Sequence, residues 1–153
     1  MWASGKIAVA GAAIGFDSRC SIQLSTPLTV VTDTWTKIPF DQPLYDNDSE
    51  FDIVTNHRFV AKVEGVYHTA ASIALLCDGV STILECTIYK NGNAIKGNKS
   101  TVQADGYVRC HVCGDIPLAV DDYIEVWGWH NRGIDKDVKD LDIHTYFDIS
   151  RFV

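Results

Sequence analysis

The stretch that decides the fold class is Tyr123-Ile124-Glu125-Val126-Trp127-Gly128-Trp129-His130. Successive side chains of an extended strand point to opposite faces, so Tyr123, Glu125, Trp127 and Trp129 share one face and the residues between them share the other. Aromatic and β-branched residues suit a pleated, half-buried surface. The stretch therefore predicts a β-strand that carries aromatic rings on one of its two faces.

The same period of two recurs along most of the chain, at residues 59–64, 83–88 and 143–149. No stretch sustains the i, i+3, i+4, i+7 spacing of an amphipathic helix. Turn-forming pairs separate the runs, and Asn91-Gly92 is the clearest of them because both residues tolerate positive φ in a tight hairpin. Eight to ten short strands with regular turns predict an all-β antiparallel sandwich or jelly roll.

Size and charge narrow the function classes. The length of 153 residues fits one domain. A composition of 46% hydrophobic and 22% charged residues excludes a chain that is disordered throughout. The net charge of −7 argues against nucleic acid or an anionic membrane as the main partner. No apolar run approaches the roughly 20 residues of a membrane-spanning helix.

The N-terminal segment has a different composition from the rest. Residues 7–16 are all apolar and follow a single cation, Lys6. Phe16-Asp17 makes a poor cleavage site, which argues against a signal peptide. We expect residues 1–18 to form an Ala/Gly-rich assembly arm and residues 19–153 to form the head domain, although an extra strand or lid on its own domain stays open. The anchoring residues of the arm would be Ile7, Val9, Ile14 and Phe16.

Five cysteines, an odd number, favour reduced and buried thiols over a disulfide framework. Cys110-His111-Val112-Cys113 contains a C-x-x-C spacing. On a strand, Cys110 and Cys113 point to opposite faces and cannot close on one zinc ion. Structural thiols are therefore favoured over metal or redox chemistry.

The order of several motifs is familiar. Trp35-Thr36-Lys37-Ile38-Pro39-Phe40-Asp41 precedes Asn56-His57-Arg58-Phe59 and Val63-Glu64-Gly65-Val66-Tyr67. Ile88-Tyr89-Lys90-Asn91-Gly92, the run from Leu118 to Gly128, and Thr145-Tyr146-Phe147 follow in that order. Over about residues 20–153, this order resembles the jelly-roll head of complement component one, subcomponent q, and its tumour-necrosis-factor-like relatives. It resembles most the versions found in bacteriophage fibre and virion-surface proteins.

The resemblance implies a ten-stranded antiparallel jelly roll that forms a homotrimer with binding loops at one end. The family's motif residues match Phe59, Gly65 and Tyr67, the Asn91-Gly92 hairpin, and Phe147 in the last strand. The family's glycine-aspartate before the penultimate strand is Asp121-Asp122 here. Aspartate accepts positive φ less readily than glycine, so this departure puts the turn in doubt.

A separate argument from the residues also favours a trimer. Strand aromatics occur on both alternating faces, whereas one sandwich has only one interior. Rings on the outward face then need a partner, and tyrosine and tryptophan suit interfaces because each carries a polar group. The expected interface or core aromatics are Tyr67, Tyr123, Trp127 and Phe147.

Sites for ligands are weakly marked. Trp129, His130 and Arg132 lie where a strand enters a long polar loop, and they form the candidate ligand-binding patch. The loop's carboxylates are weak calcium candidates, with a solvated loop the favoured reading: Asp135, Asp137, Asp140 and Asp142. No nucleophile elbow, H-E-x-x-H or phosphate loop occurs, so no catalytic residue and no cofactor is expected.

These observations favour a non-enzymatic virion structural protein: a capsid-surface, decoration or fibre-head module. Its partners would be two further copies of itself, other virion proteins through the arm, and a host glycan or protein at its surface. The chain would be made in the host cytoplasm and located in the virion. A secreted or surface-displayed binding module for glycan or protein is the alternative, followed by a glycan-processing enzyme.

Overall fold

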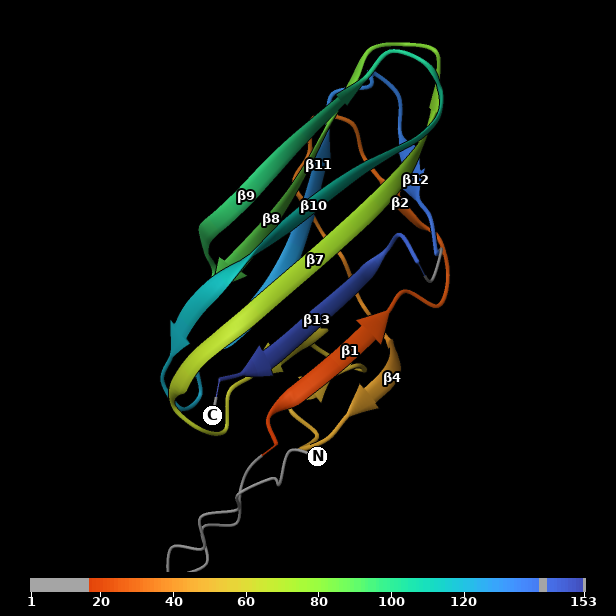
Figure 1. The fold of residues 1–153 in the computed structure, drawn as a ribbon. Helices are drawn as coiled ribbons and strands as arrows, with labels where there is room; N and C mark the ends of the chain where they lie inside the picture. Colours follow the sequence, from red (N-terminus) through yellow and green to blue (C-terminus); the bar gives the residue numbers. More distant parts are fainter. Residues whose placement is uncertain (1–16, 141–142, 153) are drawn as a thin grey trace, which may run out of the picture.

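The computed structural model describes residues 17–140 and 143–152, and these form two antiparallel β-sheets and no helix (Figure 1). Period-two sequence patterns become strands because alternate residues enter the space between the sheets. The all-β antiparallel fold predicted from the sequence is therefore confirmed. The described residues contain thirteen strands rather than ten, because five short strands of two or three residues add to the eight longer ones.

Sheet A is built around β7 (Gly65–Asp78), the longest strand together with β10 (Asp105–Leu118). β10 pairs with β7 along its whole length, from Leu118 opposite Gly65 to Asp105 opposite Asp78. The other edge of β7 is shared by β13 (Tyr146–Arg151) and β12 (Lys136–Val138). The sheet continues from β13 to β1 (Arg19–Gln23) and β4 (Gln42–Asp46), while β12 pairs with β2 (Leu28–Val30).

Sheet B is built around β11 (Tyr123–His130), the strand quoted first above. One edge of β11 pairs with β8 (Thr82–Lys90), which continues to β9 (Asn93–Val102). The other edge pairs with β3 (Thr36–Lys37) and β6 (Arg58–Val60), and β6 leads to β5 (Phe51–Asp52). Sequence-distant strands thus lie side by side in both sheets, which requires many long-range contacts.

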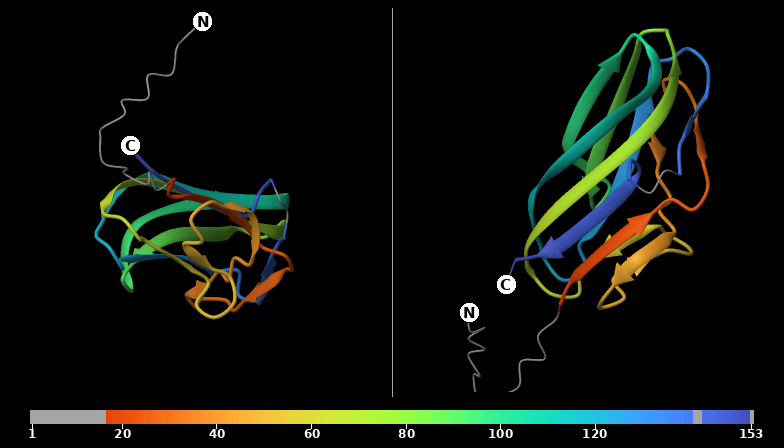
Figure 2. Two further views of the ribbon diagram at one scale, coloured as in Figure 1. Left: turned by 90° about the horizontal axis from the view of Figure 1, so that it is seen from below. Right: turned by 45° about the vertical axis from the view of Figure 1, so that its right-hand side comes forward.

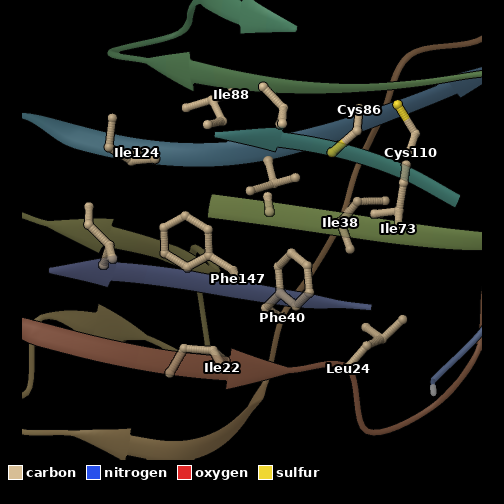
Figure 3. Close-up of a cluster of buried hydrophobic side chains, with 14 of the residues drawn as sticks. Ile22, Leu24, Ile38, Phe40, Ile73, Cys86, Ile88, Cys110, Ile124 and Phe147 are labelled. Carbon is tan, nitrogen blue, oxygen red and sulfur yellow. The ribbon is translucent and has the colours of Figure 1, made fainter. Parts of the chain in front are cut away.

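The core lies between the two sheets, which appear as two layers in the left view of Figure 2. Phe147 is packed against Phe40 and Phe51, with ring centroids 6.2 and 5.6 Å away. Phe59 meets Tyr67 edge to face at 5.5 Å. Figure 3 shows the aliphatic and thiol side chains that fill the rest of this layer. Burial of these rings and methyl groups is the main force that holds the sheets together.

Two of the turns that carry residues with positive φ test predictions made from the sequence. Asn91 and Gly92 have φ of 51° and 78° and join β8 to β9, which confirms the predicted hairpin. Asp121 has φ of 70°, so the aspartate at the family's glycine position does adopt the left-handed turn. The backbone N–H of Asp121 donates to the Ala61 carbonyl, which ties this turn to the segment before β7.

Candidate binding surfaces

The outer face of sheet A, which we call the A face, has small side chains at its centre. Ala70, Ser72 and Ala74 point outward from β7, because Ala71, Ile73 and Leu75 between them enter the core. Each is flanked by its register partner on β10, respectively Cys113, His111 and Arg109. Ser72 and Ala74 are buried within the protomer, and the His111 and Tyr146 rings meet across Ser72.

The two ends of the A face are apolar and exposed. Leu76 and Tyr107 are opposite each other on β7 and β10, and each is 43% exposed. At the other end, Val66 and Phe152 are exposed, and the Phe152 N–H donates to the Val66 carbonyl. These residues form two separate apolar patches, one at each end of the face, and exposed apolar patches often mark interaction surfaces.

Polar groups lie between these apolar ends. His68 Nδ1 is 2.8 Å from the Asp115 carboxylate, and the His68 ring also contacts Phe152. The Tyr146 ring contacts His111 across Ser72. Burial, followed by the charge of Asp148, raises the pKa of the Tyr146 hydroxyl, so it stays a neutral hydrogen-bonding group.

Four aromatic rings on the outer face of sheet B contact one another and form what we call the aromatic patch: Trp35, Tyr89, Trp127 and Trp129. Trp127 and Trp129 point outward from β11, since Val126, Gly128 and His130 are buried. Trp35, in the segment before β3, is 39% exposed, and its ring centroid lies 6.4 Å from those of both Tyr89 and Trp129. Tyr89 and Trp127 are 5.2 Å apart.

Charged side chains border the aromatic patch as two ion pairs. Lys37 Nζ lies 2.7 Å from Glu125 Oε1, and Trp127 Nε1 donates to Glu125 Oε2 at 3.1 Å. The Glu125 side chain is only 10% exposed. Lys99 Nζ lies 2.6 Å from Glu85 Oε1 on the neighbouring strands. The patch therefore contains donors, acceptors and ring faces, with no net charge from its four ionic groups.

The four predicted interface or core aromatics divide between the two environments. Tyr67 and Phe147 are buried in the core. Tyr123 and Trp127 are half-buried on the outer face of sheet B, where the Arg58 guanidinium lies 4.1 Å from the centroid of the Tyr123 ring. None of the four lies on the A face.

The structure separates the three residues predicted to form one ligand patch, which corrects that expectation. His130 is fully buried; its Nε2–H donates to the Val30 carbonyl and its Nδ1 accepts from the Arg132 N–H. The Arg132 side chain pairs with Asp78 at the loop end. Only Trp129 faces outward on sheet B. An even position on β11 enters the core, and that parity removes His130 from the surface.

The predicted calcium candidates engage the protein's own groups. The Asp137 carboxylate accepts from the Thr29 hydroxyl, and that of Asp135 accepts from the Thr32 N–H. Asp140 is half-buried, and Asp142 lies outside the described residues. Among residues 17–140 and 143–152, no three His, Cys, Asp or Glu side chains converge to hold a metal ion.

Four of the five cysteines are buried, and Cys113 is exposed on the A face. The expectation that all five thiols are buried is therefore wrong for Cys113, because odd positions of β10 point outward. Burial raises the pKa of the Cys86 and Cys110 thiols, and the Cys110 thiol donates to the Asn98 carbonyl. A raised thiol pKa disfavours the thiolate needed for metal binding or nucleophilic attack.

The predicted arm residues Ile7, Val9, Ile14 and Phe16 lie outside the described residues. Ser18, placed at the end of the arm by the sequence, is buried in the head domain. Its hydroxyl donates to the buried carboxylate of Glu50, which also accepts the Lys62 N–H. Ser18 therefore fixes the point at which the chain enters sheet A.

Trp35 is the main feature of the aromatic patch that sequence reasoning did not include. Its separation from Tyr89 and Trp129 along the chain gives no local signal of contact. The alternation in 123–130 did indicate that Trp127 and Trp129 share a face. Only the pairing of β3 and β8 with β11 brings the other two rings to that face.

Comparison with solved structures places the fold among tumour-necrosis-factor-like and complement-head jelly rolls. The Eiger TNF structure from S. frugiperda covers 90% of this chain and 93% of its own, with a TM-score of 0.69 and 12% identity. Murine APRIL at pH 5.0 covers 89% and 99%, with a TM-score of 0.67 and 12% identity. The globular domain of the zebrafish complement 1qA protein covers 89% and 98%, with a TM-score of 0.56 and 17% identity. The predicted jelly-roll class is thereby confirmed.

Comparisons of sequence give less information than the comparison of structures. No protein-family profile matches the chain. YqcC of Bacillus subtilis strain 168, an uncharacterised protein, is 30% identical over 110 residues, or 68% of this chain. This chain spans about 30% of the length of that curated relative. No helix among the described residues is long and apolar enough to cross a membrane.

Proposed function

We propose that the chain is a non-enzymatic binding module that works as a homotrimer. Three copies pack through the A face, and the outer face of sheet B points away from the common axis. The observation that carries this proposal is the A face itself, with small central residues between two exposed apolar ends. The tumour-necrosis-factor-like fold supports it, because the resemblance described from the sequence implies a trimer.

The contact in such a trimer is of the head-to-tail type, in which two different surfaces of each copy meet and close a ring. The β10 side of sheet A carries Arg109 together with Asp105 and Asp115, and the opposite side carries Arg19 together with Asp46 and Asp148. Charges of both signs on each side allow ion pairs across such a contact.

Molecular mass in solution tests the trimer. Sedimentation equilibrium at micromolar concentration should give three times the mass of one chain. Leu76→Asp puts a charge into one apolar end of the proposed interface and should give monomers that keep their β-sheet circular dichroism, because Leu76 is exposed in the single protomer. Val54→Asp, at a 79% exposed position in the turn between β5 and β6, is the matched control and should remain trimeric. A stable wild-type monomer would refute the proposal.

We place the trimer on a bacteriophage particle, as a capsid-surface, decoration or fibre-head protein whose residues 1–16 attach it to other virion proteins. The motif order that resembles phage versions of this fold and the apolar composition of residues 7–16 support this placement. The full-length chain should be found in purified particles in multiples of three copies. Deletion of residues 1–16 should release it from the particles, and retention of the truncated protein there would exclude the anchoring role.

A further inference from the structure

We infer that the aromatic patch binds a neutral carbohydrate chain, with sugar rings stacked on Trp35 and the rings next to it. The inference rests on the proposed binding function and names its ligand class. Trp129, Trp35, Tyr89 and Trp127 touch in that order, with consecutive ring centroids 5.2 to 6.4 Å apart. The face of an aromatic ring carries negative partial charge, so it attracts the weakly positive C–H groups of a sugar ring and also shields them from water.

The patch is ordered before any ligand binds. The nearly buried Glu125 carboxylate holds the Trp127 N–H with one oxygen and the Lys37 ammonium with the other. Trp35 is in contact with two further rings. Side chains that are already fixed lose little conformational freedom on binding, which favours affinity.

Next to the aromatic rings, strand β9 has a glycine, and so no side chain, on the outer face of sheet B. Trp127, Thr87 and Gly97 form one row across β11, β8 and β9. A Cβ atom at Gly97 would lie 2.7 Å from the Thr87 hydroxyl oxygen, so this position has no room for a larger residue without a shift of Thr87. β9 therefore has no side chain at this row, and a flat chain of rings can lie across it.

The charges of the patch match a neutral ligand. Lys37 with Glu125 and Lys99 with Glu85 cancel, so a strongly acidic or basic partner gains no net attraction. Each pair nevertheless offers both donors and acceptors, which is what sugar hydroxyl groups require. A protein is the competing occupant, since tryptophan and tyrosine are also enriched at protein interfaces, and it is the alternative if no neutral sugar binds.

Titration with defined oligosaccharides tests the inference. The probes are the neutral hexasaccharides cellohexaose, chitohexaose, xylohexaose and mannohexaose, with the acidic galacturonate hexamer for comparison, followed by calorimetry and tryptophan fluorescence. At least one neutral probe should bind with a Kd below about 10 mM. Trp35→Ala and Trp129→Ala should each weaken that binding by about fivefold or more, since truncated aromatic anchors typically lose this much. Val54→Ala, outside the patch, should leave it unchanged.

Three results would overturn the inference: no binding of any neutral probe, binding that both tryptophan variants retain in full, or tighter binding of the acidic hexamer. Circular dichroism and molecular mass, measured on every variant, confirm that each is folded. A wild-type trimer that binds no sugar would remove this inference and leave the proposed trimer intact. A monomer whose sugar binding depends on Trp35 would support the sugar inference and refute the proposed trimer.

Discussion

Asp121 shows how one residue departs from the family pattern and still forms the turn. Its φ of 70° lies in the left-handed region, which costs a residue with a side chain roughly 1–2 kcal/mol. Neighbouring interactions hold the turn despite this cost: the Asp122 carboxylate accepts from the Asn91 side-chain amide at 2.6 Å and the Ala119 N–H at 2.8 Å, and pairs with Lys90 at 2.8 Å.

Asp121→Gly should raise the free energy of unfolding by about 0.5–1 kcal/mol. Glycine removes the left-handed penalty and gives back part of that gain as lost backbone entropy. Asp121→Ala is the control and should lower stability, because alanine tolerates this φ less well than aspartate does. Denaturant unfolding of both variants measures the two effects. If glycine destabilises as much as alanine does, the strain is not located at this residue.

Asp122 makes stability depend on acidity. Hydrogen bonds from Lys90 and then Asn91 lower the pKa of its carboxyl to about 2, below the ordinary value of about 3.9. A pKa lowered by folding contributes stability that is complete above about pH 4 and is lost as the pH falls toward 2. Asp122→Asn should lower stability at neutral pH and flatten the part of the pH profile between 4 and 2. An unchanged slope in unfolding experiments across that interval would contradict the assignment.

At the scale of elements, the β8–β9 hairpin supports more than its own two strands. The Asn91 side chain donates to Asp122 and accepts the Tyr123 N–H at 2.9 Å, so it joins the hairpin to the start of β11. The sequence indicated the turn and not this bridge, because the two segments are more than 30 residues apart. The hairpin and the β10–β11 loop thus stabilise each other.

Asn91→Ala should cost about 2 kcal/mol of folding free energy, from two lost hydrogen bonds and a side chain that tolerates φ of 51° less well. Asn93→Ala in the same hairpin is a matched control, since its side chain makes one long hydrogen bond, 3.2 Å to the Asn91 carbonyl. The control should change stability by less than about 0.5 kcal/mol. If both variants lower the free energy of unfolding by the same amount in urea, the hydrogen bonds from Asn91 to the start of β11 do not contribute measurably to stability.

At the scale of the whole molecule, the two sheets have outer faces of different character. The A face has small residues between apolar ends, and sheet B has ring faces with neutralised charges. One face therefore suits contact with an identical copy, and the other suits a ligand. The outward aromatics from which the sequence predicted a trimer lie on sheet B, whereas the trimer contact that we propose is on the A face.

Cys113 reports directly on which face closes the trimer. It is the one exposed cysteine of the five, and it lies next to Ala70 at the centre of the A face. The wild-type trimer should show no rapidly reacting thiol toward a maleimide, whereas the Leu76→Asp monomer should show one per chain. Labelling followed by mass spectrometry counts the modified thiols. Rapid labelling of Cys113 in a species of trimer mass would mean that another face forms the contact.

Residues only a few positions apart are enough to predict the all-β class, the Asn91-Gly92 hairpin and the parity of β11. The sequence also placed Tyr67 and Phe147 among residues that need burial. The tertiary structure alone decided which face of each strand meets the core, and so buried His130 and exposed Cys113. It also brought Trp35 to Tyr89 and Trp129. Strand order and register arise from contacts between distant segments, and the local pattern of polar and apolar residues does not encode which strands will pair.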